Sequence, residues 1–430
     1  WDLIQKQKYS TTALDDEMAF ARLMAEQERT GFPFCVERAE KLVQTLMVAQ
    51  AKLSDEITAA VPPWTVEESF TPKANNKKLG YAKGVPFIKR KTIVFNPTSR
   101  DHISDRLTAL YGWKPSVFTP NGKPKVDENV LMELDYPIAQ LLAKNFLLSK
   151  RLSQLATGNQ AWMKKAINGK IHGRVITNGA VTGRCTHASP NIAQVPSTRA
   201  WYGTECRQLF TAPEGRVLVG SDASGLELRV LAHFLSVAGD PSYAEEVVNG
   251  DVHTRNQQMA GLPTRDAAKT FIYALLYGAG DELIGKTVGG GRGEGRKLKT
   301  KFFDSLPALR KLVDACKSKS QHRGYLIGID GRRLHSKSPH SSLNLLLQSA
   351  GALVCKHWAV QANRLFKERN LDVQWHAAVH DEYQVSCPKD QADLVGAAFQ
   401  DAMRLTQSHY KIKCQLDTDF NVGSNWAQTH

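Results

Sequence analysis

Residues 217–229 join a short apolar strand to a helix through an aspartate, and this junction constrains the fold more than any other segment. The first three residues predict a buried strand, and residues 225–237 have the pattern of a helix. Asp222 therefore stands at the carboxyl end of the strand, sheltered by it yet reachable from solvent. Such a carboxylate suits a hard cation, and an aspartate that caps the following helix is the equally good alternative.

A second segment, residues 264–278, predicts a helix with one cationic and aromatic stripe. Thr264 can cap its start and Gly278 its end. Side chains at steps of four residues turn by only about 40° per step, so four of them share one slanted face: Arg265, Lys269, Tyr273 and Tyr277. Two cations followed by two rings suit a triphosphate beside a base or sugar. A solvated basic stripe next to a buried aromatic seam is the alternative.

An acidic pair, Asp381 and Glu382, lies at a predicted turn between two strands within residues 373–387. Adjacent acids in a turn are often only turn residues. Here the apolar residues on both sides predict burial, and buried carboxylates need a cation. Together with Asp222, the pair predicts a two-metal site for phosphoryl transfer, with the ions about 3.5–4 Å apart.

The charge of the chain favours a polyanionic partner. Its 430 residues include 56 Lys and Arg against 42 Asp and Glu, a net charge of +14, and such an excess is typical of proteins that bind nucleic acid. Residues 71–95 contain seven basic residues and no acid, and Gly80, Gly84 and Pro86 interrupt any helix there. We expect a basic loop or short hairpin that touches phosphates, a merely solvated loop being the alternative.

The remaining composition bears on the compartment. The seven cysteines are dispersed without a Cys-x-x-Cys pair, which fits a reducing compartment rather than a disulfide scaffold or a cysteine zinc site. No apolar run approaches the roughly 18 residues of a membrane span, and the chain does not open with a charged-then-apolar signal. We expect a protein of the cytoplasm with no membrane partner.

Helical periodicity extends through much of the chain, and the pattern becomes mixed α/β from residue 169. A first helix follows Thr12, and we interpret Asp15 and Glu17 near its start as capping acids. Further helices are predicted at residues 36–61, 98–111, 136–156, 265–277, 343–366 and 390–408.

Three motifs resemble those of family A DNA polymerases, the DNA polymerase I family, and most of all the replicative polymerases of T-seven-like podophages. They are Asp222-Ala223-Ser224-Gly225-Leu226-Glu227-Leu228-Arg229, Ala268-Lys269-Thr270-Phe271-Ile272-Tyr273 with residues 276–280, and Val379-His380-Asp381-Glu382. Residues 181–184, 190–191 and 345–352 also look like the family, and the resemblance runs from about residue 15 to His430. It implies an α+β right-hand polymerase fold with a helical thumb, an antiparallel-sheet palm and helical fingers. It also implies an enzyme that adds dNTPs to a primer 3′-hydroxyl and releases pyrophosphate.

The resemblance also implies domain boundaries. They are a lead-in helix at residues 1–32, a thumb at 33–165 with the basic loop 71–95, a first part of the palm at 166–234, the fingers at 235–343 and a second part of the palm at 344–430. Members of the family usually carry an N-terminal 3′–5′ exonuclease domain. The short segment before the thumb is too small for that fold, so we expect no exonuclease domain in this chain.

Residue roles follow from the resemblance as well. Asp222 and Asp381 would bind two Mg²⁺ ions, which Mn²⁺ can replace, with the Ala223 carbonyl as a further ligand and Glu382 as the third catalytic acid. The dNTP would be held by Glu227, His253, Arg265, Lys269 and Tyr273. Template and primer would meet Tyr277, Gly280, Arg184, Gln348 and His380, and the DNA backbone would meet Lys73, Lys77, Lys78, Lys89 and Arg90.

The expected partners are primer-template DNA and dNTPs, with the protein as a monomer. In the T-seven branch a long thumb insertion binds thioredoxin, and the loop at residues 71–95 takes its place but looks much shorter. Direct contact of this loop with duplex DNA is therefore the favoured interpretation, and a thioredoxin-like processivity factor is a doubtful partner.

Three rival functions have specific objections. A single-subunit RNA polymerase shares the palm and the cationic helix, but Glu227 beneath Tyr273 would leave little room for a ribose 2′-hydroxyl. A non-catalytic DNA-binding module has no need of Asp222 and Asp381. A phosphate-binding NTPase would need a Gly-Lys-Ser/Thr ending that the loop at residues 289–293 lacks.

Overall fold

The computed structural model describes residues 10–430, which form two compact units. The smaller unit is Val36–Lys164, and the larger one joins the described residues up to Cys35 with Lys165–His430. None of the described helices is long and apolar enough to cross a membrane. The division of the larger unit into palm and fingers stays a prediction, as does the assignment of the smaller one as a thumb.

The smaller unit is mainly helical. Its helix α3 contacts α6 and buries Leu42, Leu46, Leu53 and Ile57, whereas Met47 is 58% exposed. Pro62 and Pro63 follow the helix end. In chain order the elements are α3 (Val36–Ala60), β2 (Trp64–Phe70), β3 (Phe87–Ile93), α4 (Arg100–Tyr111), α5 (Glu128–Met132), α6 (Pro137–Leu152), a π-helical turn (Ser153–Thr157) and α7 (Trp162–Lys165).

The basic segment of this unit is a hairpin that starts before residue 71. Strands β2 and β3 pair so that Glu67 lies opposite Arg90 and Glu68 opposite Lys89. The Arg90 Nε lies 2.7 Å from a Glu67 carboxylate oxygen, and the Lys89 ammonium lies 3.4 Å from the centre of the Phe70 ring. The absence of acids within residues 71–95 was therefore a misleading signal, because pairing with the preceding strand supplies them.

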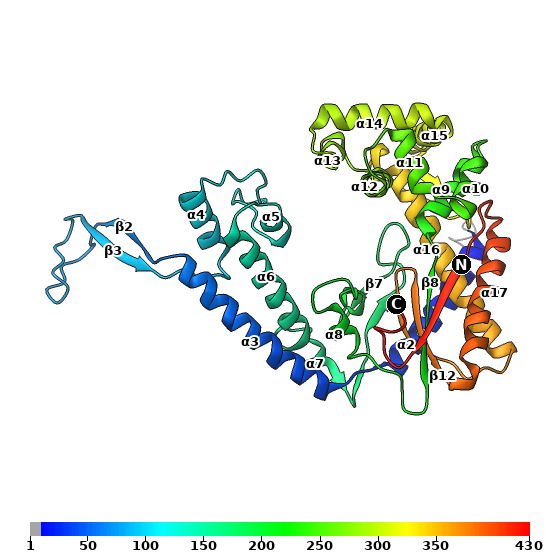
Figure 1. The fold of residues 1–430 in the computed structure, drawn as a ribbon, viewed down its shortest axis with the longest axis horizontal. Helices are drawn as coiled ribbons and strands as arrows, with labels where there is room; N and C mark the ends of the chain where they lie inside the picture. Colours follow the sequence, from blue (N-terminus) through cyan, green and yellow to red (C-terminus); the bar gives the residue numbers. More distant parts are fainter. Residues whose placement is uncertain (1–9) are drawn as a thin grey trace. The chain divides into compact units, whose positions relative to one another are not determined.

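A four-stranded antiparallel sheet lies at the centre of the larger unit (Figure 1). Its order is β11 (Gln374–Val379), β12 (Glu382–Cys387), β8 (Val217–Ala223) and β13 (Thr418–Gly423). In the register of β8, Asp222 faces Glu382 on one side and Asp419 on the other. Gly220, in the middle of β8, has no room for a side chain because Thr429 and the Gln384 amide lie directly against it.

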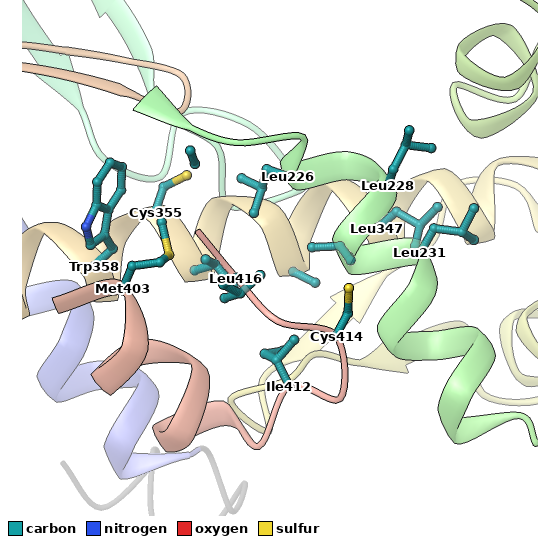
Figure 2. Packing of buried hydrophobic residues seen from close by; sticks show 14 of the residues in the cluster. Leu226, Leu228, Leu231, Leu347, Cys355, Trp358, Met403, Ile412, Cys414 and Leu416 are labelled. Carbon is teal, nitrogen blue, oxygen red and sulfur yellow. The ribbon is translucent and has the colours of Figure 1, made fainter. Parts of the chain in front are cut away.

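Helix α16 (Ser342–Glu368) packs against α2 (Thr11–Thr30), α17 (Ala392–Tyr410) and α9 (Leu226–Val237), while α2 contacts β11 and α17 contacts β8 and β13. The apolar faces of these helices join in one core, and Figure 2 shows part of this cluster. Trp358 of α16 is fully buried, and its indole N–H donates to the carbonyl of Phe399. The mixture of helices with an antiparallel sheet confirms the expected α+β class.

A group of helices follows β8 in the chain. The helix α12 begins after Thr264, whose hydroxyl accepts from the Ala267 N–H, and it ends before Gly278 at φ 77°, as the sequence predicted. The predicted loop at residues 289–293 is shorter than expected, because α14 already starts at Arg292. The elements are α9 (Leu226–Val237), α10 (Ser242–Asn249), α11 (Val252–Ala260), α12 (Arg265–Leu276), α13 (Asp281–Lys286), α14 (Arg292–Ser305), α15 (Pro307–Arg323), β9 (Tyr325–Ile327) and β10 (Arg333–His335).

Short elements connect these parts. The segment Phe32–Pro33 (β1) pairs with Lys170–Ile171 (β5), so the residues on either side of the smaller unit are joined in one small sheet. The remaining elements are β4 (Ala166–Ile167), β6 (Arg174–Ile176), β7 (Thr186–Ala188), α8 (Gly203–Arg207) and single 3₁₀ turns at Ile192–Gln194, Pro339–Ser341 and Lys389–Gln391.

Helix α2 is held to the larger unit by buried charge. Ser10, not an acid, caps this helix. The Glu17 carboxylate lies 2.7 Å from the Lys356 ammonium of α16 and 2.8 Å from the guanidinium of Arg332. Lys356 is 3% exposed, and burial lowers its pKa. The interpretation of Glu17 as a capping acid was therefore wrong, while Asp15 is exposed on the helix surface.

Replacing Glu17 with Gln should destabilise the protein by about 3 kcal/mol, because it leaves the Lys356 ammonium buried without its counter-charge. Urea unfolding of parent and variant measures the difference. Glu26→Gln, an exposed acid on the same helix, is the matched control and should change stability by less than about 0.5 kcal/mol. Equal effects of the two substitutions would contradict the assigned role of the ion pair.

Candidate active site

Two of the predicted acids meet at one end of the central sheet. Asp222 lies near the end of β8, and Asp381 lies in the two-residue turn between β11 and β12. The Ala223 N–H donates to the Asp381 carbonyl at 3.0 Å, which fastens the turn to the strand. His380, the other turn residue, has the left-handed φ of 59° that this tight connection requires. The predicted grouping of Asp222 with Asp381 is thus present in the structure.

The electrostatics of these two carboxylates are those of an anionic site that lacks a counter-charge. Asp222 is an exposed residue, yet the surrounding protein partly desolvates its carboxylate. This desolvation, together with the charges of Asp381 and Glu382, raises the pKa of Asp222 to about 7. Desolvation, followed by the charge of Glu227, raises the pKa of Asp381 to about 6. Neither carboxylate forms an ion pair within residues 10–430. Two oxygen ligands in such a setting fit a hard divalent cation.

Glu382 has a different environment from the other two acids. It is 4% exposed, and its carboxylate accepts from the Gln384 amide at 2.8 Å and from the indole of Trp426. His430 Nδ1 lies 2.8 Å away and the Arg207 guanidinium 3.7 Å away. Burial alone would raise its pKa, but the His430 hydrogen bond and the Arg207 charge lower it.

The surroundings of Glu382 were missed by sequence reasoning. Its carboxylate is fully occupied by protein groups, so its prediction as a third catalytic acid receives no support from the geometry. Arg207, Gln384, Trp426 and His430 lie in three separate segments of the chain, and no local pattern marks them. The sequence predicted that the two strands around Asp381 and Glu382 are buried. This predicted burial is the one sequence signal that Glu382 would need polar partners.

The cationic end of α12 faces the start of α11. Arg265 Nε lies 2.8 Å from the carboxylate of Asp251, the residue that caps α11. His253 follows in the first turn of α11, and its pKa is lowered by burial and then by the charges of Arg265 and Lys269. The three predicted phosphate-binding side chains are therefore neighbours, and Arg265 is already paired with an acid that sequence reasoning did not consider.

The aromatic end of α12 meets Glu227. The Tyr277 hydroxyl lies 3.2 Å from the Glu227 carboxylate, and Arg184 lies 3.6 Å from the same oxygen. Tyr273 is half-buried, with its ring centre 6.3 Å from that of His253. Glu227 was expected beneath Tyr273. The Glu227 charge contributes, after burial, to the raised pKa of Tyr273, and its hydrogen-bond partner is Tyr277, one helical turn further on.

A cavity of about 270 Å³ opens beside these residues. Its apolar wall includes Phe20, Leu226 and part of α16. Its charged and polar lining includes Arg184, His187, Glu227, Tyr277, Lys356, His380 and Asp381. The structure thus brings together residues from six separate stretches of the chain around one opening.

Other predicted site residues lie apart from this cavity lining. Gln348 is half-buried on α16. Gly280 precedes α13 and lines a different pocket. The predicted DNA-contacting residues of the hairpin belong to the smaller unit, which is described by itself: Lys73, Lys77, Lys78, Lys89 and Arg90.

Comparisons with known proteins agree on one family. Residues 86–428 match the family model described as DNA polymerase family A. The chain is 39% identical to the DNA-directed DNA polymerases of Enterobacteria phage T3 and Escherichia phage T7, over 98% of its own length and 70% of theirs. It is 26% identical to the thermostable DNA polymerase I of Thermus aquaticus over 60% of its length and 32% of that protein.

A solved structure has a similar fold. It is described as the POL domain of Pol1 from M. smegmatis in complex with DNA primer-template and dNTP, and it is 19% identical to this chain. The alignment has a TM-score of 0.79 and covers 96% of this chain and 70% of that one. The expected right-hand polymerase fold is thereby confirmed.

Asp222→Asn should stabilise the metal-free protein, because it removes one of the crowded like charges. A carboxyl whose pKa rises to about 7 on folding destabilises the folded state, and the whole of this free-energy penalty is present above pH 7. The penalty shrinks as the pH falls from 7 toward the unfolded pKa near 4. The gain should be roughly 1–2 kcal/mol at pH 8 after allowance for solvent screening and should disappear near pH 4.

Urea unfolding with a chelator present, repeated from pH 4.5 to pH 8, measures this gain. The matched control is Asp314→Asn, an exposed aspartate in the middle of α15, for which no such pH-dependent gain is expected. A loss of stability in Asp222→Asn at pH 8 would show that the carboxylate is favourably paired, against the present description.

Proposed function

This chain belongs to DNA polymerase family A, and on that basis we propose that Asp222 and Asp381 hold two divalent cations for phosphoryl transfer. The chain is a DNA-directed DNA polymerase of this family, so the rival functions of RNA polymerase, DNA-binding module and NTPase are set aside. The observation that carries the proposal is the meeting of two uncompensated carboxylates at one sheet end.

The metal site in this proposal consists of Asp222, Asp381 and the carbonyl of Ala223. Mg²⁺ is the natural occupant, with Mn²⁺ as a substitute, because the ligands are oxygen atoms only. When bound, two such ions lower the pKa of an attacking hydroxyl and stabilise the charge on the departing pyrophosphate. Glu382 does not bind these ions in the proposal, since its carboxylate is held by Trp426 and His430. Its role is to fix the start of β12 beside Asp222.

The triphosphate in this proposal lies along the cationic end of α12. Arg265, Lys269 and His253 converge there. Arg265 has to exchange the carboxylate of Asp251 for phosphate oxygens, and this exchange is easy because the pair is exposed and solvent-screened. In this proposal Asp251 holds the Arg265 side chain in position until the triphosphate, which carries more negative charge, replaces the Asp251 carboxylate.

The nucleoside part lies at the aromatic end of the helix in this proposal. Tyr273 faces the sugar one turn beyond Lys269, and Tyr277 stands near the templating base. The hydrogen bond between Tyr277 and Glu227 ties α12 to the residue that would limit space at the 2′ position. Opening or closing of α12 would therefore also move this sugar contact.

Template and primer occupy the cavity beside Asp381 in this proposal. Arg184 and His380 line it, and Gln348 and Gly280 lie on adjoining elements. Arg184 is partly neutralised by Glu227, so it is suited to a neutral hydrogen-bond acceptor of a base edge as well as to a phosphate. Contacts of this kind read the shape of the primer end rather than its sequence.

The remaining expectations are part of the same proposal. The unit Val36–Lys164 acts as a thumb, with fingers at residues 235–343 and a palm built from residues 166–234 and 344–430. The hairpin touches duplex DNA directly, without a thioredoxin-like factor. The protein works as a monomer, and its phage relatives suggest the host-cell cytoplasm as its location.

Asp222→Ala and Asp381→Ala should each reduce nucleotide addition by at least about 10³-fold while primer-template affinity changes little. Single-turnover primer extension measures the rate, and fluorescence anisotropy of labelled DNA measures the affinity. Asp314→Ala, which removes the exposed aspartate in the middle of α15, serves as the control variant. Near-normal extension by either active-site variant would remove the assignment of metal ligands.

Tyr273→Phe should reduce the incorporation of dideoxynucleotides relative to dNTPs by more than tenfold and leave dNTP incorporation largely intact. The tyrosine hydroxyl can fill the space that a missing 3′-hydroxyl leaves, and a phenylalanine cannot form the same local hydrogen bond. Competitive incorporation of ddNTP and dNTP measures the ratio. A parent enzyme that strongly rejects dideoxynucleotides would show that Tyr273 does not line the sugar pocket.

Replacing Lys73, Lys77 and Lys78 with Ala should weaken DNA binding. It should also make the binding constant less dependent on salt, because up to about three fewer counterions are released on binding. These residues lie in the loop between β2 and β3, without an acidic partner opposite them. Arg90→Ala should have a smaller effect per charge, since Glu67 already neutralises Arg90. Binding isotherms at rising salt give the slopes, and an unchanged slope in the triple variant would mean that the hairpin does not contact DNA.

A further inference from the structure

Two histidines and an aspartate converge where three helices of the larger unit meet. Asp16 comes from α2, His357 from α16 and His409 from the last turn of α17. Within residues 10–430 this is the one group of three His, Cys, Asp or Glu side chains whose ligand atoms all lie within 4.8 Å of one another. It shares no residue with the proposed active site, and the polymerase mechanism does not use it.

The distances in this cluster are close to those of a tetrahedral metal site. His357 Nδ1 lies 3.1 Å from one carboxylate oxygen of Asp16, and His409 Nε2 lies 3.9 Å from the other. With metal–ligand bonds of about 2.0–2.1 Å, ligand atoms of a tetrahedral ion are roughly 3.3 Å apart. The exposed His409 ring is now stacked on His357 at 4.0 Å between ring centres. It has to tilt out of this stack for its nitrogen to point at the same ion.

The electrostatics of the cluster suit a cation as well. Burial would raise the pKa of Asp16, but hydrogen bonds from His357 and Tyr410 lower it, and the net direction is downward, so the carboxylate is ionised at neutral pH. Burial, followed by His357, lowers the pKa of His409, so this ring is neutral and has a lone pair to offer. Among the described residues, Asp16 has no lysine or arginine partner, and its only ion-pair partners are these two histidines.

The neighbouring polar groups can support the ligands. His357 is 3% exposed, and its Nε2 lies 3.1 Å from the Gln361 amide one turn along α16. If the Nδ1 of His357 binds a metal, its Nε2 carries the proton, and a rotated Gln361 amide can accept it through Oε1. The Tyr410 hydroxyl lies 3.1 Å from the Asp16 carboxylate and can hold that group in place.

We propose that Asp16, His357 and His409 form a binding site for a Zn²⁺-class divalent cation that fastens α2 to α16 and α17. Imidazole and carboxylate together prefer Zn²⁺ over Mg²⁺, and three protein ligands leave a fourth position for water. Binding moves the ring proton of His357 from Nδ1, which faces Asp16, to Nε2, which faces Gln361. Because only the assembled helices present all three ligands, the bound ion stabilises the docked position of α2.

Zinc uptake by the full chain tests this site. Asp222→Asn and Asp381→Asn are introduced as a common background, so that the active-site carboxylates do not contribute, and Mg²⁺ is kept in excess. Equilibrium dialysis with Zn²⁺ should give one bound equivalent, and Co²⁺ should show the visible absorption of a nitrogen-ligated tetrahedral ion. A protein that takes up no zinc, or a Co²⁺ spectrum of an all-oxygen octahedral ion, would overturn the proposal.

Three variants on that background assign the ligands. His409→Ala removes an exposed ring and Asp16→Asn keeps the size of the side chain, and each should weaken zinc binding by more than about 100-fold. Gln361→Ala should weaken it by about tenfold. His322→Ala, which also removes an exposed histidine from the last turn of a helix, is the matched control and should leave binding unchanged.

Thermal unfolding gives a second measure of the same variants. Zinc should raise the melting temperature of the background protein and of His322→Ala, but not that of His409→Ala. Unchanged zinc affinity in both Asp16→Asn and His409→Ala would show that the ion binds elsewhere, and the cluster would then be only a hydrogen-bonded contact among three helices.

Discussion

The pairing of β12 with β8 is the contact on which the rest of the site depends. Its register sets Glu382 opposite Asp222, and the turn before β12 then places Asp381 at the same end of the sheet. A shift by one residue would turn every side chain of β12 to the other face, so burial of both strands fixes the register and the register fixes the metal ligands. Asp419 of β13, on the other side of Asp222, continues the same row of acids.

Concentrating carboxylates in this way opposes folding, and the protein balances each acid differently. Glu382 is paired with the charge of Arg207 and hydrogen-bonded to His430. Asp222 and Asp381 stay unpaired, which raises the pKa of both groups. Asp381 lines the cavity, so its destabilising charge is kept where a cation and substrate would use it.

Charge also organises the periphery of the larger unit. Glu17 connects α2 to Lys356 and Arg332, and Asp16 connects it to His357 and Tyr410. Two adjacent residues of one helix thus make two separate polar contacts with α16, one of them a buried ion pair. These contacts lie beside the core of α9, α16 and α17, so the position of α2 depends on packing and on specific partners together.

Local patterns determined a large part of this protein. Thr264 and Gly278 bound α12 as expected, the apolar run 217–219 forms a strand that ends near Asp222, and the motifs identified the family. These features depend on neighbours a few residues away, and those neighbours are visible in the sequence.

The tertiary structure alone decided which acid of the pair Asp381 and Glu382 faces the cavity. It also decided that Glu227 meets Tyr277, that Glu67 neutralises Arg90, and that Glu17 is buried against Lys356. Each of these outcomes depends on strand register or helix docking between distant segments, and such pairings leave no periodic signal in the sequence.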